Sequence, residues 1–136
     1  MNLEQIELVK KTWSQVSGDP DAVAALFYDR LFQIAPEARP LFPESMEEQG
    51  AKLMQMLATA IANLDRLGEV RPALTALAVR HLDYGTLPEH YPIVGQALLD
   101  TLDRGLGEDF TPEVRAAWSE IYEKLSSIMI VAAAET

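Results

Sequence analysis

The residues best suited to chemistry in this chain of 136 residues are its two histidines, His81 and His90. The chain has no cysteine, so thiolate catalysis, thiolate metal sites and disulfides are excluded, and a metal needs His, Met, carboxylates or a prosthetic group. His81 follows Leu77 by four residues and Ala78 by three, which places it on the apolar face of a predicted helix. A neutral imidazole there can give one nitrogen to a metal and donate from the other. The alternative is a core histidine bonded to a backbone carbonyl, and spacing leaves both open.

Three further residues have side chains that fit either a binding site or an ordinary core. Gln49 precedes Leu53 by four residues and Met56 by seven, so its amide shares the apolar face of a helix, where a buried amide needs partners. Tyr28 lies on an inward face of another helix, and Phe42 follows a short turn. The alternatives are a half-solvated glutamine in a first turn, a core tyrosine bonded to a carbonyl, and a phenylalanine that only packs.

Helical spacing runs through nearly the whole chain, and no segment shows the alternation of a strand, so the predicted fold class is all-α. Asn2 with Gln5 and Ser45 with Glu48 form two capping-box patterns. The predicted helices cover about residues 3–17, the stretch from Pro20 through Ile34, a short turn from Pro36 to about Phe42, a helix capped by Ser45, about residues 70–84 up to Gly85, the stretch from Pro88 to Gly105, and a terminal helix after Thr111 and Pro112.

Composition indicates one acidic domain spanning residues 1–136. The hydrophobic share of 49% suffices for one core at this length but not for two. Twenty-one acidic against eleven basic residues give a net charge of −10, which disfavours binding to nucleic acids and anionic membranes. No apolar run is long enough to cross a bilayer, and the first residues lack a signal-peptide pattern, so we expect a cytoplasmic protein. We also expect a monomer or a weak homodimer.

An ordered series of short segments resembles the globin family, in particular the bacterial single-domain globins, the globin half of flavohaemoglobins, and the neuroglobins. The resemblance covers nearly the whole chain, and the spacings are compatible throughout. The segments are LFYDRLF at 26–32, RPLF at 39–42, EQGAKLMQML from residue 48, RH at 80–81, YG at 84–85, HYPIVG at 90–95 and FTPEVRAAW at 110–118.

The resemblance implies a globin fold, a three-over-three helical sandwich around haem b, which is iron protoporphyrin IX. His81 matches the histidine that ligates the haem iron from the proximal side. Phe42 matches the phenylalanine that packs on the porphyrin. Tyr28 matches the distal tyrosine, and Gln49 with Leu53 matches the polar gate and apolar wall over the iron.

The same resemblance extends the expected site to the edge of the haem and to its proximal side. Tyr91 matches a bacterial tyrosine near the proximal histidine, and Val94 belongs to the same segment, which we expect to contact the cofactor. Arg80, Lys52 and His90 are candidates for charge-assisted bonds to the haem propionates. The alternative for these three is that they are basic residues facing solvent.

One position departs from the flavohaemoglobin pattern and bears on function. The proximal glutamate of that group follows the terminal-helix tryptophan by fifteen residues, which here gives Ala133, while Glu135 lies two residues further on another face. Without that carboxylate the proximal imidazole has less electronic push, which weakens the case for peroxidase or dioxygenase activity. We therefore expect reversible, high-affinity binding of O2, with NO and CO as further ligands. The alternatives are an NO dioxygenase served by an external reductase, a gas or redox sensor, and a structural globin without haem.

Overall fold

The computed structural model describes residues 2–42, 44–83 and 89–134, and it contains helices but no strand within those ranges. The all-α prediction is therefore confirmed. None of the described helices is both long and apolar enough to span a membrane. The elements are α1 (Leu3–Val16), α2 (Pro20–Ile34), the 3-10 helix η1 (Pro36–Leu41), α3 (Glu47–Ala62), η2 (Leu64–Arg66), α4 (Leu67–Asp83), α5 (His90–Leu106), η3 (Gly107–Asp109) and α6 (Pro112–Ala134).

Short polar side chains start α1, α2 and α6, as the sequence predicts. Asn2 Oδ1 accepts from the Gln5 backbone N–H at 2.9 Å, and Gln5 Oε1 accepts from the Asn2 N–H at 3.1 Å, so this capping box is confirmed. The side chains of Asp19 and Thr111 each accept from the backbone N–H three residues later, at 3.3 Å. These bonds satisfy N–H groups that the first turn of a helix leaves without partners.

The second predicted capping box, Ser45 with Glu48, is wrong. The helix begins at Glu47, and Met46 occupies the cap position without a side-chain hydrogen bond. The first helical bond runs from the Gly50 N–H to the Met46 carbonyl at 2.8 Å, so the helix starts one residue too late for Ser45 to cap it.

Two other predicted boundaries shift or cannot be compared. The helix expected near residue 70 begins at Leu67, because η2 runs directly into it. The ends predicted at Gly85 and Pro88 lie outside the described residues, and α5 is described from His90 onward.

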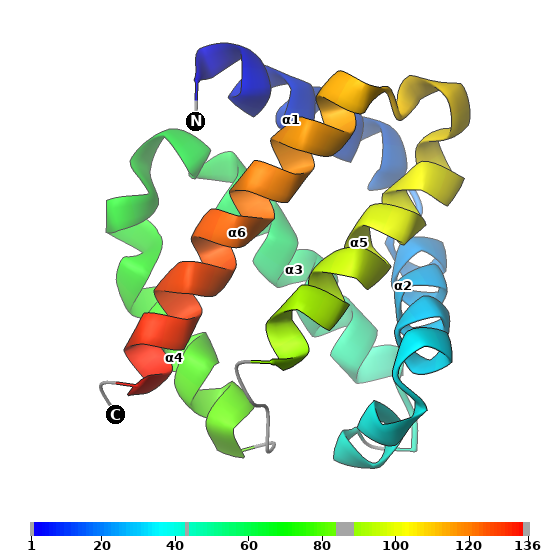
Figure 1. Ribbon diagram of the computed structural model, residues 1–136, viewed down its shortest axis with the longest axis vertical. Coiled ribbons are helices and arrows are strands. Elements are labelled where there is room, and N and C mark those ends of the chain that lie inside the picture. Colours follow the sequence, from blue (N-terminus) through cyan, green and yellow to red (C-terminus); the bar gives the residue numbers. More distant parts are fainter. Residues whose placement is uncertain (1, 43, 84–88, 135–136) are drawn as a thin grey trace.

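The long helices form two layers of three, as the sequence analysis expects. One layer holds α2, α5 and α6, and the other holds α1, α3 and α4. In Figure 1, α5 and α6 run side by side in front, and α3 crosses behind them. The layers are joined where α1 and α4 pack on α6 and where α2 packs on α3.

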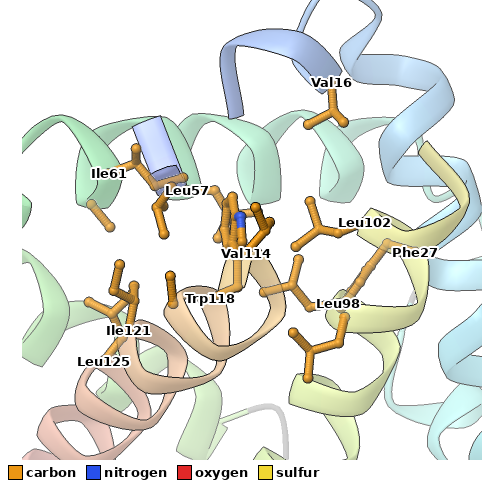
Figure 2. Close-up of a cluster of buried hydrophobic side chains, with 14 of the residues drawn as sticks. Val16, Phe27, Leu57, Ile61, Leu98, Leu102, Val114, Trp118, Ile121 and Leu125 are labelled. Atoms are coloured by element: carbon orange, nitrogen blue, oxygen red, sulfur yellow. The ribbon is translucent and has the colours of Figure 1, made fainter. Parts of the chain in front are cut away.

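The centre of the main core is Trp118, which is 1% exposed (Figure 2). Leu98 and Leu102 of α5 lie on one side of its ring and Ile121 of α6 on the other. Its indole Nε1 donates to the Thr12 hydroxyl at 2.8 Å. Burial of a large ring together with a satisfied N–H fixes α6 against α1.

Two glycines allow neighbouring helices to approach closely. A Cβ on Gly95 would lie 2.7 Å from the ring of Tyr122, whose hydroxyl donates to the Tyr91 carbonyl at 2.6 Å and joins α6 to α5. A Cβ on Gly50 would lie 3.0 Å from the Cβ of Ala24. That second contact sets the spacing between α3 and α2, the helices that carry Gln49 and Tyr28.

Gly95→Ala should destabilise the protein because the added methyl overlaps a ring that is held in place by its own hydrogen bond. We expect the free energy of unfolding to fall by about 1–3 kcal/mol, which is the usual cost of overpacking. This is the net loss, since alanine also has a higher helix propensity than glycine. Urea unfolding measures it. Gly18→Ala is the matched control, since nothing lies within 4 Å of its Cβ position. Equal stability of the two variants would contradict the close-approach interpretation.

Candidate functional site

A cavity of about 620 Å³ opens between the two layers, a size typical of sites for small molecules and cofactors. Its lining comes from α2, η1, α3, α4 and the first turn of α5. All the residues that the sequence analysis expects at the site, except Tyr91, line this one cavity: Tyr28, Phe42, Gln49, Lys52, Leu53, Arg80, His81, His90 and Val94. Residues from five separate segments thus meet around the same space.

His81 is half-buried near the end of α4, and its ring is oriented by its own helix. Nδ1 donates to the Leu77 carbonyl at 2.8 Å, because a carbonyl oxygen can only accept. The proton therefore resides on Nδ1, and the lone pair of the neutral ring resides on Nε2. The two sequence interpretations are compatible, since the bond to a backbone carbonyl is the arrangement that prepares a histidine to ligate a metal.

The surroundings of His81 favour the neutral ring. Burial lowers the pKa of the imidazole, and the charge of Arg80 lowers it further, while the bond to the Leu77 carbonyl acts in the opposite direction. A neutral imidazole is the form that can coordinate a metal ion. The ring therefore stays competent for ligation below the pH at which a solvated histidine would protonate.

Tyr28 and Gln49 form a polar pair in an otherwise apolar part of the lining. Tyr28 is 6% exposed, and burial raises the pKa of its phenol to about 12, with a hydrogen bond to the Gln49 side chain acting in the opposite direction. The phenol brings one donor hydrogen and the amide brings two. Whichever side donates in the bond between them, two donor hydrogens remain for another acceptor.

Aromatic contacts hold Tyr28 and Phe42 in place. The Phe42 ring meets the Tyr28 ring edge-on at 5.6 Å between centroids and the Phe32 ring at 5.4 Å. Such edge-to-face pairs are favoured by the ring quadrupoles. The sequence analysis did not single out Phe32, although it follows Tyr28 by four residues and shares its helical face.

Tyr91 lies beside His81, where the resemblance places it, but it is not among the residues that line the cavity. Its ring stacks near the His81 ring, with centroids 6.5 Å apart and planes at 23°. Tyr91 turns away from the cavity because it is buried in a second core cluster with Ala78, Met129 and Ala132. Ala133 is partly buried against that cluster, whereas Glu135 lies outside the described residues.

Basic residues gather at the edge of the cavity. Lys52, Arg80 and His90 all contribute to the lining, and Arg80 is exposed. Lys52 Nζ lies 3.7 Å from Glu48 Oε1, but its side chain is 60% exposed, so this ion pair is weak and easily exchanged. These three basic side chains are therefore placed where they could bind an anionic group of a ligand in the cavity.

Comparison with known proteins identifies relatives over most of the chain. The family model described as Globin matches residues 25–129. The flavohemoprotein of Bacillus subtilis is 33% identical over 92% of this chain, but the match covers only 32% of that protein. The chain thus spans about a third of the length of the flavohemoproteins that it matches. The anaerobic nitrite reductase NSHB5 of Oryza sativa subsp. indica is 30% identical over 90% of this chain and 89% of that protein.

Solved structures agree with the family match. A bacterial globin from Campylobacter jejuni superimposes with a TM-score of 0.89 at 26% identity, covering 98% of this chain and 97% of that one. An engineered carbene transferase from Rhodothermus marinus superimposes with a TM-score of 0.90 at 27% identity, covering 99% and 94%. The helices described above therefore take up the globin fold along the whole described chain.

The burial of Tyr28 predicts that its phenol ionises late. Ultraviolet titration of the wild type should show a tyrosine step near pH 12 that is missing in Tyr28→Phe. The free energy of unfolding should fall as the pH rises from about 10 to about 12, since the unfolded chain releases this proton first. A difference between the two titrations centred near pH 10 would show that Tyr28 is solvated.

Proposed function

This chain belongs to the globin family, and on that premise we propose that it binds haem b in the cavity and holds O2 reversibly at the ferrous iron. The observation that carries the proposal is the arrangement of the lining, in which Tyr28 and Gln49 share one cavity with a histidine whose Nδ1 already carries the proton. NO and CO are the further ligands that we propose for the same site.

The residues present fit a haem. The cavity lining is mostly apolar, as a porphyrin ring requires, and it contains Phe42, Leu53 and Val94. His81 would supply a neutral nitrogen donor to the iron. Lys52 and Arg80 would supply cations for the propionates, with His90 as a further hydrogen-bond donor. When bound, haem supplies an iron atom that takes up a diatomic gas and shifts electron density onto O2.

The side chains that line the cavity then determine how slowly the bound gas dissociates. Tyr28 and Gln49 can donate hydrogen bonds to the partial negative charge on O2, and such bonds are stronger in a low-dielectric cavity than in water. Leu53, Met56 and Phe42 exclude water, which slows oxidation of the iron. High affinity and slow release follow from this combination.

The proximal side supports gas binding over rapid turnover. By resemblance, Ala133 stands where flavohaemoglobins have a proximal glutamate, and its methyl group packs against the apolar cluster around Tyr91 and Met129. A histidine without a carboxylate partner is a weaker electron donor to iron, so breaking an O–O bond is less favoured.

A second candidate is NO dioxygenase activity with an external reductase, in which O2 and nitric oxide give nitrate. The identity of 33% to a flavohemoprotein favours it. Catalytic consumption of NO in the presence of O2, a reductase and its reduced nicotinamide would establish this second function. Single-turnover consumption only would leave reversible O2 binding as the function.

His81→Ala should lose most of its haem, because the nitrogen donor and its orienting bond to Leu77 both disappear. His90→Ala should retain haem, since it removes only a contact at the edge of the cavity. The ratio of Soret to protein absorbance in the purified variants measures both. Equal haem content in the two variants would refute the assignment of His81 as ligand.

Tyr28→Phe should speed O2 release by about 10- to 150-fold, since a hydrogen bond to a charged group is worth about 1.5–3 kcal/mol. CO release should change far less, because bound CO carries little negative charge on its oxygen. Gln49→Leu should act in the same direction and be non-additive with Tyr28→Phe if both donors serve one atom. Stopped-flow displacement of O2 and CO from both single variants and the double variant measures these rates. Equal effects on the two gases would indicate a change of cavity volume instead.

A further inference from the structure

The segment between η1 and α3 contributes Phe42 to the cavity and leads directly into the turn that carries Gln49. Met46 occupies the cap position of α3 and makes no side-chain hydrogen bond there. The segment is therefore not held to the helix by a capping side chain, as is common elsewhere. Another group must hold it, and the described contacts identify a side chain that does.

Arg39, near the end of η1, binds this segment at two points. Nη2 donates to the Glu44 carbonyl at 2.9 Å, and Nη1 donates to the Phe42 carbonyl at 3.4 Å. The first distance is that of a good hydrogen bond, and the second is longer than the usual range, so it marks a weaker contact. Both donors are charged, which strengthens the bonds. One guanidinium thus donates to the backbone carbonyls of both Phe42 and Glu44.

The same guanidinium also lies over an aromatic ring. Its central carbon is 5.2 Å from the centroid of Phe32, within the range of a cation–π contact. Phe32 in turn meets Phe42 edge-on and stacks on Tyr28 at 6.1 Å and 27°. One cation therefore connects the carbonyls of Phe42 and Glu44 with the aromatic cluster that contains Tyr28.

The backbone beneath Arg39 is already restricted. Pro36 begins η1 and Pro40 lies within it, and each proline fixes its own φ angle. A side chain anchored on such a turn loses less freedom when it binds. Arginine suits the position because it combines a planar face for stacking with a fork of donors, whereas lysine offers a single charged point.

We propose that Arg39 is a positioning residue for the distal side of the cavity. It holds the backbone carbonyls of Phe42 and Glu44, keeps the Phe42 and Tyr28 rings in place through Phe32, and so sets how firmly the chain retains its cofactor. The inference rests on the proposed haem site for its second readout below, but the first readout depends on the protein alone.

The first test follows hydrogen exchange of the first bonded backbone amides of α3, residues 50–53, in the full chain as purified. Arg39→Met removes the fork and the planar face, and we expect exchange there to quicken about tenfold, equivalent to one lost charge-assisted bond. Arg30→Met is the matched control, since Arg30 pairs with Asp100 at 2.7 Å and touches none of this segment in the described contacts. Unchanged exchange in Arg39→Met, or an equal change in Arg30→Met, would overturn the proposal.

The second test measures transfer of ferric haem to an excess of an acceptor apoprotein. Arg39→Met should lose haem about tenfold faster than the wild type, and Arg30→Met at the wild-type rate. Arg39→Lys should resemble Arg39→Met, because charge alone restores neither the fork nor the stacking. Wild-type retention in Arg39→Lys would overturn the role of the planar fork. A wild type that binds no haem would refute the proposed function, while the exchange result would still decide the role of Arg39.

Discussion

The hydrogen bond from Nδ1 of His81 to the Leu77 carbonyl determines what the cavity can do. An imidazole that is half-buried among apolar groups must be neutral, and this bond decides which nitrogen keeps the proton. The acceptor belongs to the preceding turn of the same helix, so α4 orients the ring without help from another element. The phenol of Tyr28, the amide of Gln49 and the ring of Phe42 line the same cavity as this imidazole, whose lone pair the bond to Leu77 leaves on Nε2.

The opposite wall depends on how closely helices approach. Gly50 lets α3 lie against Ala24 of α2, and Gln49 and Tyr28 of these two helices line the same cavity. Gly95 allows a similarly close approach of α5 and α6, beside the ring that stacks near His81. Packing at these two glycines thus sets the spacing of helices that carry the polar groups.

Local sequence patterns predicted the helices well where short-range chemistry decides them. Asn2 and Gln5 bond each other within one turn, so their types alone reveal the cap. The prediction for Ser45 failed because α3 begins at Glu47 with Met46 at the cap position, one residue later than the pattern indicates, and spacing alone does not fix that boundary. Spacing likewise placed His81 on an inward face of its helix, but it could not show that Tyr91 belongs to a separate core cluster. The resemblance to a family supplied the grouping of the site residues, which no local pattern contains.

The tight contact at Gly50 has an evolutionary consequence. A side chain at residue 50 requires Ala24 to give way by a few tenths of an ångström, because the Cβ position is already 3.0 Å from the Cβ of Ala24. A mutation at residue 49 exchanges only the group at the tip of a half-buried side chain. Substitutions at residue 49 can therefore change a polar group of the cavity lining at little cost in packing, whereas those at residue 50 disturb the contact between α3 and α2. A position that tolerates substitution and a position that resists it are thus adjacent in the sequence.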